Sequence, residues 1–362
     1  MKKVLFIVEA MGGGVFTYIV EMANILSKKY DVYVAYGLRK QTPENYKDYF
    51  NKSVHLIHVK NFTRQINLQK DLKAFIEIRK IKRKVNPDII HLHSSKAGIL
   101  GRIAFINDNS SSIFYTPHGY SFLMQNKDVS NIKKKFFYCL EKICSNIKGI
   151  TIACSYGEYL EAKKLSKSVT YVSNGININE IDSILKNKKN KKNNSLTFST
   201  LGRISDQKNP LLFNELARSF PNYSFKWIGN GEREEQLTSP NIEITGWLNR
   251  KDALYELETT DVFLLPSLWE GLPMSLLEAM YLKKICIVSN IKGNNNVIIN
   301  KKNGFICDSY DNYVSVIKSI IKQEVDINNI KINAHNDILY NYNTEIMFNK
   351  YSNIYESGEN AK

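Results

Sequence analysis

The feature of this sequence that most limits its fold is a regular alternation of short apolar runs with longer amphipathic segments. The runs have the length of buried strands, and apolar residues in 16–29, 68–85 and 131–148 have helical spacing. Such alternation is typical of an α/β fold with parallel sheets. In the first half of the chain the predicted strands are 3–8, 31–36, 54–59, 88–93, 112–118, 149–154 and 169–175.

The alternation restarts after a polar, basic segment at 186–195, which we predict to be a solvated surface loop. The sequence therefore predicts two α/β domains, 1–175 and 176–340, and then a helix in 341–362. Because ligands bind at the carboxyl ends of parallel strands, we expect a ligand cleft between the domains. The second set of predicted strands is 196–202, 223–229, 242–247, 261–267, 285–290 and 304–308, and helices are predicted in 312–358.

The charge balance points to an anionic partner. Fifty Lys and Arg side chains against 35 Asp and Glu give a formal net charge of +15. Nucleic acid, an acidic membrane surface and a phosphorylated ligand all fit this excess, and so does a general bias toward Lys and Asn. The sequence has no helix-turn-helix, RNP-type or zinc-finger pattern, so we expect no nucleic-acid partner.

The N-terminus and the cysteines both point to the cytoplasm. The apolar run near the N-terminus is too short for a signal peptide and meets Glu9, so we interpret it as a strand. No uncharged apolar run approaches the roughly 18–20 residues of a membrane span. The cysteines lack paired or zinc-binding spacing, and we expect them to be reduced and mostly buried. They are Cys139, Cys144, Cys154, Cys286 and Cys307.

Two carboxylates stand at a predicted strand-to-helix junction, WEGLPMSLLEAM at 269–280. Pro273 suits the first position of a helix, and a helix N-terminus with its free amides suits a phosphate. Glu278 would lean back toward that end and accept two hydrogen bonds from a vicinal diol such as a ribose. Glu270 could bind another hydroxyl-bearing part of the ligand. The alternative is two surface glutamates at a helix start, which favours acids. Gly271 is expected at the turn, and the free amides at the helix start are expected to be those of Met274, Ser275 and Leu276.

Two further strand-to-helix loops carry candidate ligand contacts. LGRISDQKNP places Arg203 and Lys208 on one loop. The forked guanidinium of Arg203 and the ammonium of Lys208 could together bind a diphosphate. NIEITGWLNR places Gly246 and Trp247 at a strand end, where glycine allows close approach to a flat base. The alternatives are solvated loop cations for the first loop and a plain turn with a packing tryptophan for the second.

These segments together resemble the retaining glycosyltransferase family 4, which has the GT-B fold. The resemblance implies that 1–175 and 176–340 are Rossmann-like domains with a ligand cleft between them, and that the helix in 341–362 packs back on the first domain. LGRISDQKNP followed by PSLWEGLPMSLLEAM matches the family pattern, and seven residues separate Glu270 from Glu278, as in the E-x7-E signature. DIIHLHSSKAGILGR and YTPHGYSF resemble N-domain segments of bacterial members that build surface polysaccharides. The resemblance covers essentially the whole chain.

The resemblance implies a role for each segment. Arg203 and Lys208 would hold the donor diphosphate, Glu278 the ribose and Glu270 the transferred sugar. The N-terminal domain would bind the acceptor and the C-terminal domain the nucleotide sugar. The loop that contains Gly12, Gly13 and Gly14 would lie over the donor phosphate and the acceptor, before a helix that begins at Phe16 and Thr17. Gly246 and Trp247 would lie near the base, and His118 would face the donor sugar unless it is only a histidine at the edge of the core.

The resemblance also implies the reaction. The family moves a sugar from a nucleoside diphosphate to an acceptor hydroxyl with retention, and the donor expected here is UDP-GlcNAc, UDP-GalNAc, UDP-glucose or UDP-galactose. The expected acceptor is an undecaprenyl-diphosphate-linked saccharide in capsule, O-antigen or exopolysaccharide synthesis. The sequence lacks the D-x-D motif of the other common glycosyltransferase fold, so we expect neither a metal nor a cofactor. A soluble or protein acceptor, a sugar-nucleotide epimerase and a phosphorylase remain alternatives.

Two basic helical segments could contact an anionic membrane. In 70–85 and 132–143, lysines and arginines stand beside apolar and aromatic residues. The alternative for both is an amphipathic helix that packs on its sheet with a solvated basic face. We favour packing for 70–85 and membrane contact for 132–143, at the inner face of the cell membrane.

Overall fold

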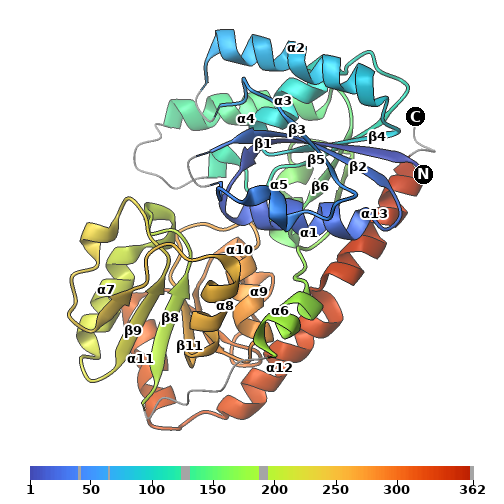
Figure 1. The fold of residues 1–362 in the computed structure, drawn as a ribbon. Coiled ribbons are helices and arrows are strands. Elements are labelled where there is room, and N and C mark those ends of the chain that lie inside the picture. Colours follow the sequence, from blue (N-terminus) through green and yellow to red (C-terminus); the bar gives the residue numbers. More distant parts are fainter. Residues whose placement is uncertain (40–41, 64–65, 124–130, 187–194, 359–362) are drawn as a thin grey trace. The chain divides into compact units, whose positions relative to one another are not determined.

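The computed structural model describes residues 1–39, 42–63, 66–123, 131–186 and 195–358. The chain divides into two compact units (Figure 1). Unit 1 comprises 1–174 and 344–362, and unit 2 comprises 175–343. Each unit contains one parallel sheet, and each is described here by itself.

Unit 1 contains a parallel sheet in the order β3-β2-β1-β4-β5-β6-β7. Its strands are β1 Lys3–Met11, β2 Asp31–Leu38, β3 His55–His58, β4 Ile89–His93, β5 Ser112–Thr116, β6 Ile150–Ala153 and β7 Val169–Tyr171. Its helices are α1 Gly13–Leu26, α2 Leu68–Val85, α3 Ser95–Ala104, α4 Asn131–Ser145, α5 Tyr156–Lys163 and α13 Thr344–Gly358.

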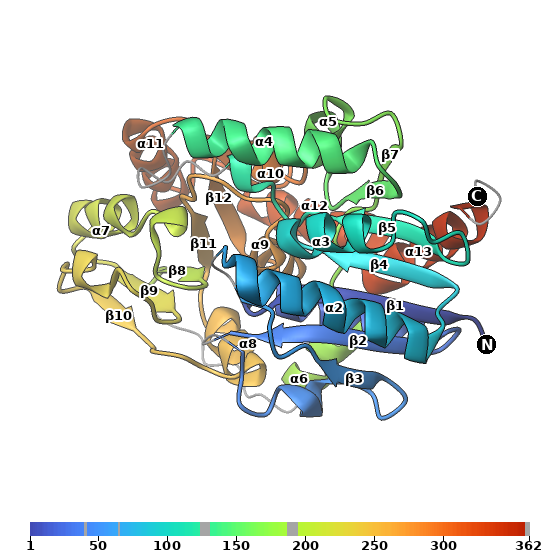
Figure 2. The ribbon, with the colours of Figure 1, turned by 90° about the horizontal axis from the view of Figure 1, so that it is seen from above.

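Alternation along β1 gives unit 1 two apolar layers. Val4, Phe6 and Val8 pack with residues of α1 and α13, whereas Leu5 and Ile7 pack with residues of α2 and α3. Both layers form because successive side chains of a strand point to opposite faces of the sheet. Figure 1 shows α2, α3 and α4 along one face of this sheet, with α1 and α13 on the other, and Figure 2 shows α2, α3 and α4 side by side.

The helix α13 belongs to unit 1 although unit 2 precedes it in the sequence. The Tyr18 hydroxyl of α1 donates to the Tyr351 hydroxyl over 2.6 Å, and the Tyr355 hydroxyl lies 2.7 Å from His91 Nδ1. All four residues are buried. These buried polar contacts fix the position of α13 against the sheet of unit 1.

Unit 2 contains a parallel sheet in the order β10-β9-β8-β11-β12-β13. Its strands are β8 Thr197–Leu201, β9 Ser224–Ile228, β10 Ile242–Ile244, β11 Val262–Leu265, β12 Ile285–Ser289 and β13 Phe305–Cys307. Its helices are α6 Ile178–Leu185, α7 Pro210–Ser219, α8 Arg250–Glu258, α9 Met274–Tyr281, α10 Lys292–Asn295, α11 Tyr310–Ile321 and α12 Ile327–Asn341. Residues of α7 and α11 pack on one apolar layer of this sheet.

The structure confirms a strand at each of the thirteen predicted runs. Helix α2 begins and ends at the predicted residues, because the Asn67 side chain caps its first turn and Asn86 ends it in the left-handed conformation. Residues 187–194 of the predicted loop lie outside the described residues. Four cysteines are buried and Cys139 is exposed, as expected for mostly buried thiols.

The glycine-rich segment differs from the prediction. Strand β1 continues through Glu9 to Met11, and α1 begins at Gly13 rather than at Phe16. Gly13 and Gly14 therefore form the first turn of a helix and not a loop before it. Gly13 has a φ of +57°, a conformation that glycine adopts without the steric cost of a side chain. No helix among the described residues is long and apolar enough to cross a bilayer.

Candidate active site

Glu270 accepts hydrogen bonds from two side chains of the loop after β8. Lys208 Nζ donates to Glu270 Oε1 over 2.7 Å, and Gln207 Nε2 donates to Glu270 Oε2 over 3.2 Å. The same Gln207 nitrogen donates to the Trp269 carbonyl over 3.0 Å. The Glu270 side chain is 8% exposed, so its charge is largely removed from water and depends on Lys208 for compensation.

The backbone at Glu270 lies directly against α10. A Cβ built on Gly293 would come within 2.6 Å of the Glu270 carbonyl oxygen. Only glycine lets the two chain segments approach this closely. The segment that carries Glu270 is thus fixed from two sides, by the Lys208 loop and by Gly293.

Arg203 stands just after β8 on the loop that also carries Lys208. Its Nε lies 3.8 Å from Glu232 Oε2, and both side chains are solvent-exposed. An ion pair of this length in water contributes little. The Arg203 guanidinium is therefore available for another anion, whereas the Lys208 ammonium already has a carboxylate partner.

The N-terminus of α9 follows the Gly271-Leu272-Pro273 turn, with Pro273 at the N-cap rather than at the first helical position. The amides of Met274 and Ser275 occupy the first two helical positions, which have no intrahelical acceptor. The Leu276 amide donates to the Pro273 carbonyl over 3.1 Å, so the prediction of a free amide at Leu276 is wrong. The Pro273 carbonyl therefore accepts the first hydrogen bond at the start of α9.

Glu278 is buried in α9, and an arginine that the sequence analysis missed holds its carboxylate. Arg250 Nη1 donates to Glu278 Oε1 over 2.6 Å, and Arg250 Nε lies 3.3 Å from both carboxylate oxygens of Glu180. Arg250 is the first residue of α8, after the Asn249 cap. Its place three residues beyond Trp247 was the only signal in the sequence, and nothing in that spacing names Glu278 as its partner.

Gly246 and Trp247 lie in the segment that leads to Arg250. Gly246 has a φ of +73° and forms an isolated bridge with Gly229. A Cβ at Gly246 would meet nothing within 4 Å, so one side of this backbone is open. Trp247 is 56% exposed and is not a core side chain. The local geometry leaves an indole and an uncovered backbone segment free to contact a planar group.

In unit 1, His118 stands at the end of β5 in a strained turn. His118 has a φ of +55° and Gly119 a φ of +93°. The Gly119 amide donates to Glu158 Oε1 over 2.6 Å, and the Cys154 amide donates to Glu158 Oε2 over 2.7 Å. Glu158 is buried, and burial raises the pKa of its carboxyl group. Its two backbone hydrogen bonds hold the turn at His118.

Three histidines lie next to one another at this end of the sheet. His93 Nδ1 lies 3.0 Å from His118 Nε2, and the His91 and His93 rings are 4.0 Å apart. Removal from water lowers the pKa of His118 to about 3 and the pKa values of His91 and His93 well below their usual range. All three imidazoles are therefore neutral at physiological pH. The Tyr18 ring stands edge-on to His118 at 4.6 Å.

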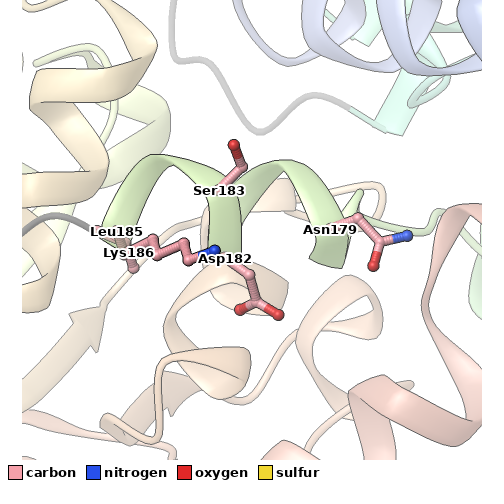
Figure 3. Close-up of a pocket in the computed structure, with 5 residues that line it drawn as sticks. All are labelled: Asn179, Asp182, Ser183, Leu185 and Lys186. Carbon is pink, nitrogen blue, oxygen red and sulfur yellow. The ribbon is translucent and has the colours of Figure 1, made fainter.

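A separate pocket lies along α6 in unit 2 (Figure 3). Asp182, one of its lining residues, accepts a hydrogen bond of 2.6 Å from the Tyr281 hydroxyl. The pocket is lined by Asn179, Asp182, Ser183, Leu185 and Lys186. None of these is a predicted site residue. Within the described ranges, no three His, Cys, Asp or Glu side chains form a group that could hold a metal ion.

Two family models match the chain, one in each half. The model described as Glycosyltransferase Family 4 matches residues 12–180, and the model described as Glycosyl transferases group 1 matches residues 182–337. A UDP-Gal:alpha-D-GlcNAc-diphosphoundecaprenol alpha-1,3-galactosyltransferase of Escherichia coli is 31% identical over 340 residues, covering 85% of each chain. The capsular polysaccharide biosynthesis glycosyltransferase CapM of Staphylococcus aureus is 24% identical over 344 residues, covering 86% of this chain and 87% of CapM.

Solved structures show the same fold at low identity. Sucrose-phosphate synthase of Thermosynechococcus elongatus has a TM-score of 0.81 with 13% identity, and all of each chain is covered. Anabaena HepE, solved with UDP and glucose, has a TM-score of 0.78 with 16% identity, covering 99% of this chain and all of HepE. Two Rossmann-like parallel α/β units with such neighbours define a glycosyltransferase of the GT-B class. Within that class, the chain belongs to glycosyltransferase family 4.

Proposed function

We propose that this glycosyltransferase moves a sugar from a UDP-sugar to a lipid-linked saccharide, with retention of the anomeric configuration and without a metal ion. The observation that carries the proposal is the Lys208–Glu270 pair of 2.7 Å beside the N-terminus of α9. A cation and a helix N-terminus suit a diphosphate, and a fixed carboxylate suits sugar hydroxyls. The Escherichia coli relative, named for UDP-Gal and a diphosphoundecaprenol acceptor, supports both substrates.

The proposed reaction breaks the bond between the anomeric carbon and the diphosphate oxygen. The bonding electrons leave with the diphosphate, the acceptor oxygen forms the new bond, and the acceptor proton passes to the departing diphosphate. Negative charge on the leaving group grows toward the transition state. Arg203, Lys208 and the first amides of α9 would stabilise that charge. Glu270 would orient the sugar, and no covalent intermediate through it is proposed.

Glu278 would bind the ribose, and Arg250 would hold the Glu278 carboxylate in position. Gly246 and Trp247 would contact the base, because both lie on the segment that leads into Arg250. In unit 1, Gly13 and Gly14 at the start of α1 would lie near the donor phosphate and the acceptor, and His118 would face the donor sugar.

The test of this function is a donor panel with purified protein. UDP-galactose, UDP-GlcNAc, UDP-GalNAc and UDP-glucose, with the corresponding GDP-sugars, are mixed with a diphosphoundecaprenol-linked saccharide. We expect UDP release that requires the acceptor. Release of UDP only with water-soluble acceptors would favour the alternative of a soluble acceptor. Interconversion of UDP-sugars without transfer would favour an epimerase.

Helix α4 supports a membrane surface as a further partner. Ile132, Phe136 and Ile143 are 80%, 53% and 61% exposed, and Cys139 between them is exposed as well. Their spacing places them on one side of the helix, because residues three and four apart are neighbours. By helical spacing Lys133 and Lys135 flank this stripe, whereas Lys134 lies on the opposite side of α4. An exposed apolar stripe with flanking cations suits an anionic bilayer surface.

Helix α2 lies on the same face of unit 1 as α4 (Figure 2). Its Ala74 and Ile78 pack on the sheet, as the packing alternative for 70–85 expects, while Leu72 and Ile76 are exposed. The α2 helix thus has both a packed side and an exposed apolar side. The exposed apolar side of α2 would extend the apolar surface of α4 that is proposed to contact the membrane.

Vesicle sedimentation tests the membrane partner. We expect binding to vesicles with anionic lipid, none to neutral vesicles, and weakening by salt. Changing Lys133, Lys134 and Lys135 together to serine should release the protein, with transfer to a short soluble acceptor retained. The matched control changes Lys318, Lys322 and Lys350 to serine, with the same loss of charge elsewhere. Equal binding to neutral and anionic vesicles, or to neither, would reject a membrane partner.

A further inference from the structure

The protonation of His118 follows from an unpartnered atom of its neighbour. His93 is completely buried at the end of β4, and its Nε2 has no hydrogen-bond partner among the described residues. The Phe6 ring stands edge-on to His93 at 4.8 Å, and the His91 ring lies 4.0 Å from it. The unpartnered nitrogen thus belongs to an imidazole enclosed by aromatic rings.

A neutral imidazole carries one proton, on Nδ1 or on Nε2. A proton on His93 Nε2 would be a buried N–H without an acceptor, an arrangement that folded proteins avoid. A proton on His93 Nδ1 has an acceptor, because Nε2 of His118 lies 3.0 Å away. His93 therefore donates from Nδ1 to His118 Nε2.

The consequence for His118 is definite. A nitrogen that accepts a hydrogen bond cannot carry the proton of a neutral ring, so the proton of His118 is on Nδ1. Within the described part of the chain, no hydrogen-bond acceptor is found for that atom, and His118 is partly exposed. We propose that His93 is a positioning residue that holds His118 in the Nδ1–H form, so that His118 presents a hydrogen-bond donor to an oxygen atom of the ligand.

The surroundings of His118 keep its ring in this orientation. The Glu158 carboxylate fixes the backbone through the Gly119 amide, at 2.6 Å. The Tyr18 ring packs edge-on against the imidazole. With the backbone and one ring face both held, the bond to His93 decides which nitrogen is left for a ligand. An N–H in that position suits a hydroxyl or a phosphate oxygen and rejects a second donor.

The inference rests on the proposed function only where it names a sugar hydroxyl or a diphosphate oxygen as the ligand atom. The protonation state itself is measurable without substrate. Long-range proton–nitrogen correlation spectra of protein labelled with ¹⁵N in its histidine rings distinguish the two neutral forms. The six histidines are few enough to assign, with His118→Gln identifying the His118 signals and His93→Asn those of His93.

We expect wild-type His118 and His93 both as the Nδ1–H form. A His118 signal of the Nε2–H form would overturn the proposal. In His93→Leu, which removes the donor, His118 should become a mixture of the two forms. His93→Asn can donate from its amide and should retain the Nδ1–H form of His118. His91→Asn is the matched control, because His91 is buried beside His93 but makes no hydrogen bond to His118.

Kinetics provide the second readout. For sugar transfer, His93→Leu should lower kcat in proportion to the fraction of His118 that remains in the Nδ1–H form, about twofold for an equal mixture. His93→Asn should restore most of that loss, and KM for the acceptor should change little. An unchanged His118 form together with unchanged kcat in His93→Leu would reject His93 as a positioning residue. If the wild-type protein transfers no sugar, the proposed function fails, and the spectra still decide the protonation of His118.

Discussion

The Arg250 guanidinium donates to the Glu278 carboxylate over 2.6 Å and lies 3.3 Å from Glu180, so one arginine joins helices α6, α8 and α9. Glu278 is 4% exposed. A buried carboxylate without its cation is costly, and the arginine therefore fixes both the charge and the orientation of Glu278.

The first prediction concerns this pair. Arg250→Ala should weaken binding of the nucleotide sugar about tenfold, as expected for loss of a side chain that orients one ligand hydrogen bond, and should also lower the midpoint of thermal unfolding. Calorimetric titration with UDP and a thermal melt measure the two effects. Glu180→Gln is the control, since it keeps the Arg250–Glu278 contact. If Arg250→Ala bound UDP as tightly as the wild-type protein does, the assignment of Glu278 to the nucleotide site would be wrong.

The second prediction separates the two loop cations from Glu278. Arg203→Ala and Lys208→Ala should chiefly lower kcat, because the cations meet charge that grows in the transition state, worth about 2–4 kcal/mol for each lost donor. Glu278→Ala should chiefly weaken donor binding. Lys208→Ala should also destabilise the fold, since it leaves the Glu270 carboxylate without its cation.

Steady-state kinetics of the three variants, with Glu232→Gln as the control for Arg203, decide the assignment. The Arg203–Glu232 distance of 3.8 Å between exposed side chains predicts no kinetic effect of that control. Near-wild-type kcat/KM in both cation variants would be incompatible with a diphosphate clamp.

The third prediction is full activity in EDTA. Its reason is the pair of cations, Arg203 and Lys208, together with the amide groups at the start of α9, which could compensate the diphosphate charge. Initial rates with and without chelator are compared at one ionic strength. A large loss of rate that Mg²⁺ or Mn²⁺ restores would reveal a metal requirement.

The fourth prediction is a pH dependence of stability. Because the folded-state pKa of His118 is lowered to about 3, the unfolded chain binds a proton near pH 6.5 that the folded protein does not bind. Stability contributed by neutral His118 is therefore present above about pH 6.5 and is lost progressively as the pH falls toward 3. His91 and His93 act in the same direction.

Denaturant unfolding at several pH values measures this loss. Between pH 6 and pH 4, His118→Gln should reduce the slope of unfolding free energy by up to about 1.4 kcal/mol per pH unit, the value for one proton. His55→Gln is the control, because its side chain is half exposed and beside Asp31. Equal slopes for wild type and His118→Gln would show that His118 is protonated in the folded protein.

The sequence contained most of the information about the sheets and less about the side chains of the site. Strands of a buried parallel sheet have apolar side chains on both faces of the sheet. Runs such as 3–8 and 285–290 could therefore be recognised as strands from their own sequence. The start of α1 was missed because three consecutive glycines predict an irregular loop, and the helix there depends on packing of Phe16 and Tyr18.

The candidate residues came from segments that combine a strand end with charged side chains, and this is why Glu270 and Lys208 were found together. Their direct contact could not be predicted, since it joins residues 62 positions apart. Arg250 and His93 were missed for the same reason. Arg250 contacts Glu278 and Glu180, and His93 contacts His118. These partners are distant in sequence, and only the folded chain identifies them.

The return of α13 to unit 1 makes unit 2 an insertion within unit 1. The chain passes from unit 1 into unit 2 after residue 174 and returns to unit 1 after residue 343. During synthesis, the sheet of unit 1 emerges complete but lacks the helix that provides Tyr351 and Tyr355 to its buried polar groups. Unit 1 is therefore complete only once α13 has been synthesised, and a fragment ending at 174 should leave the His91 ring without its Tyr355 partner.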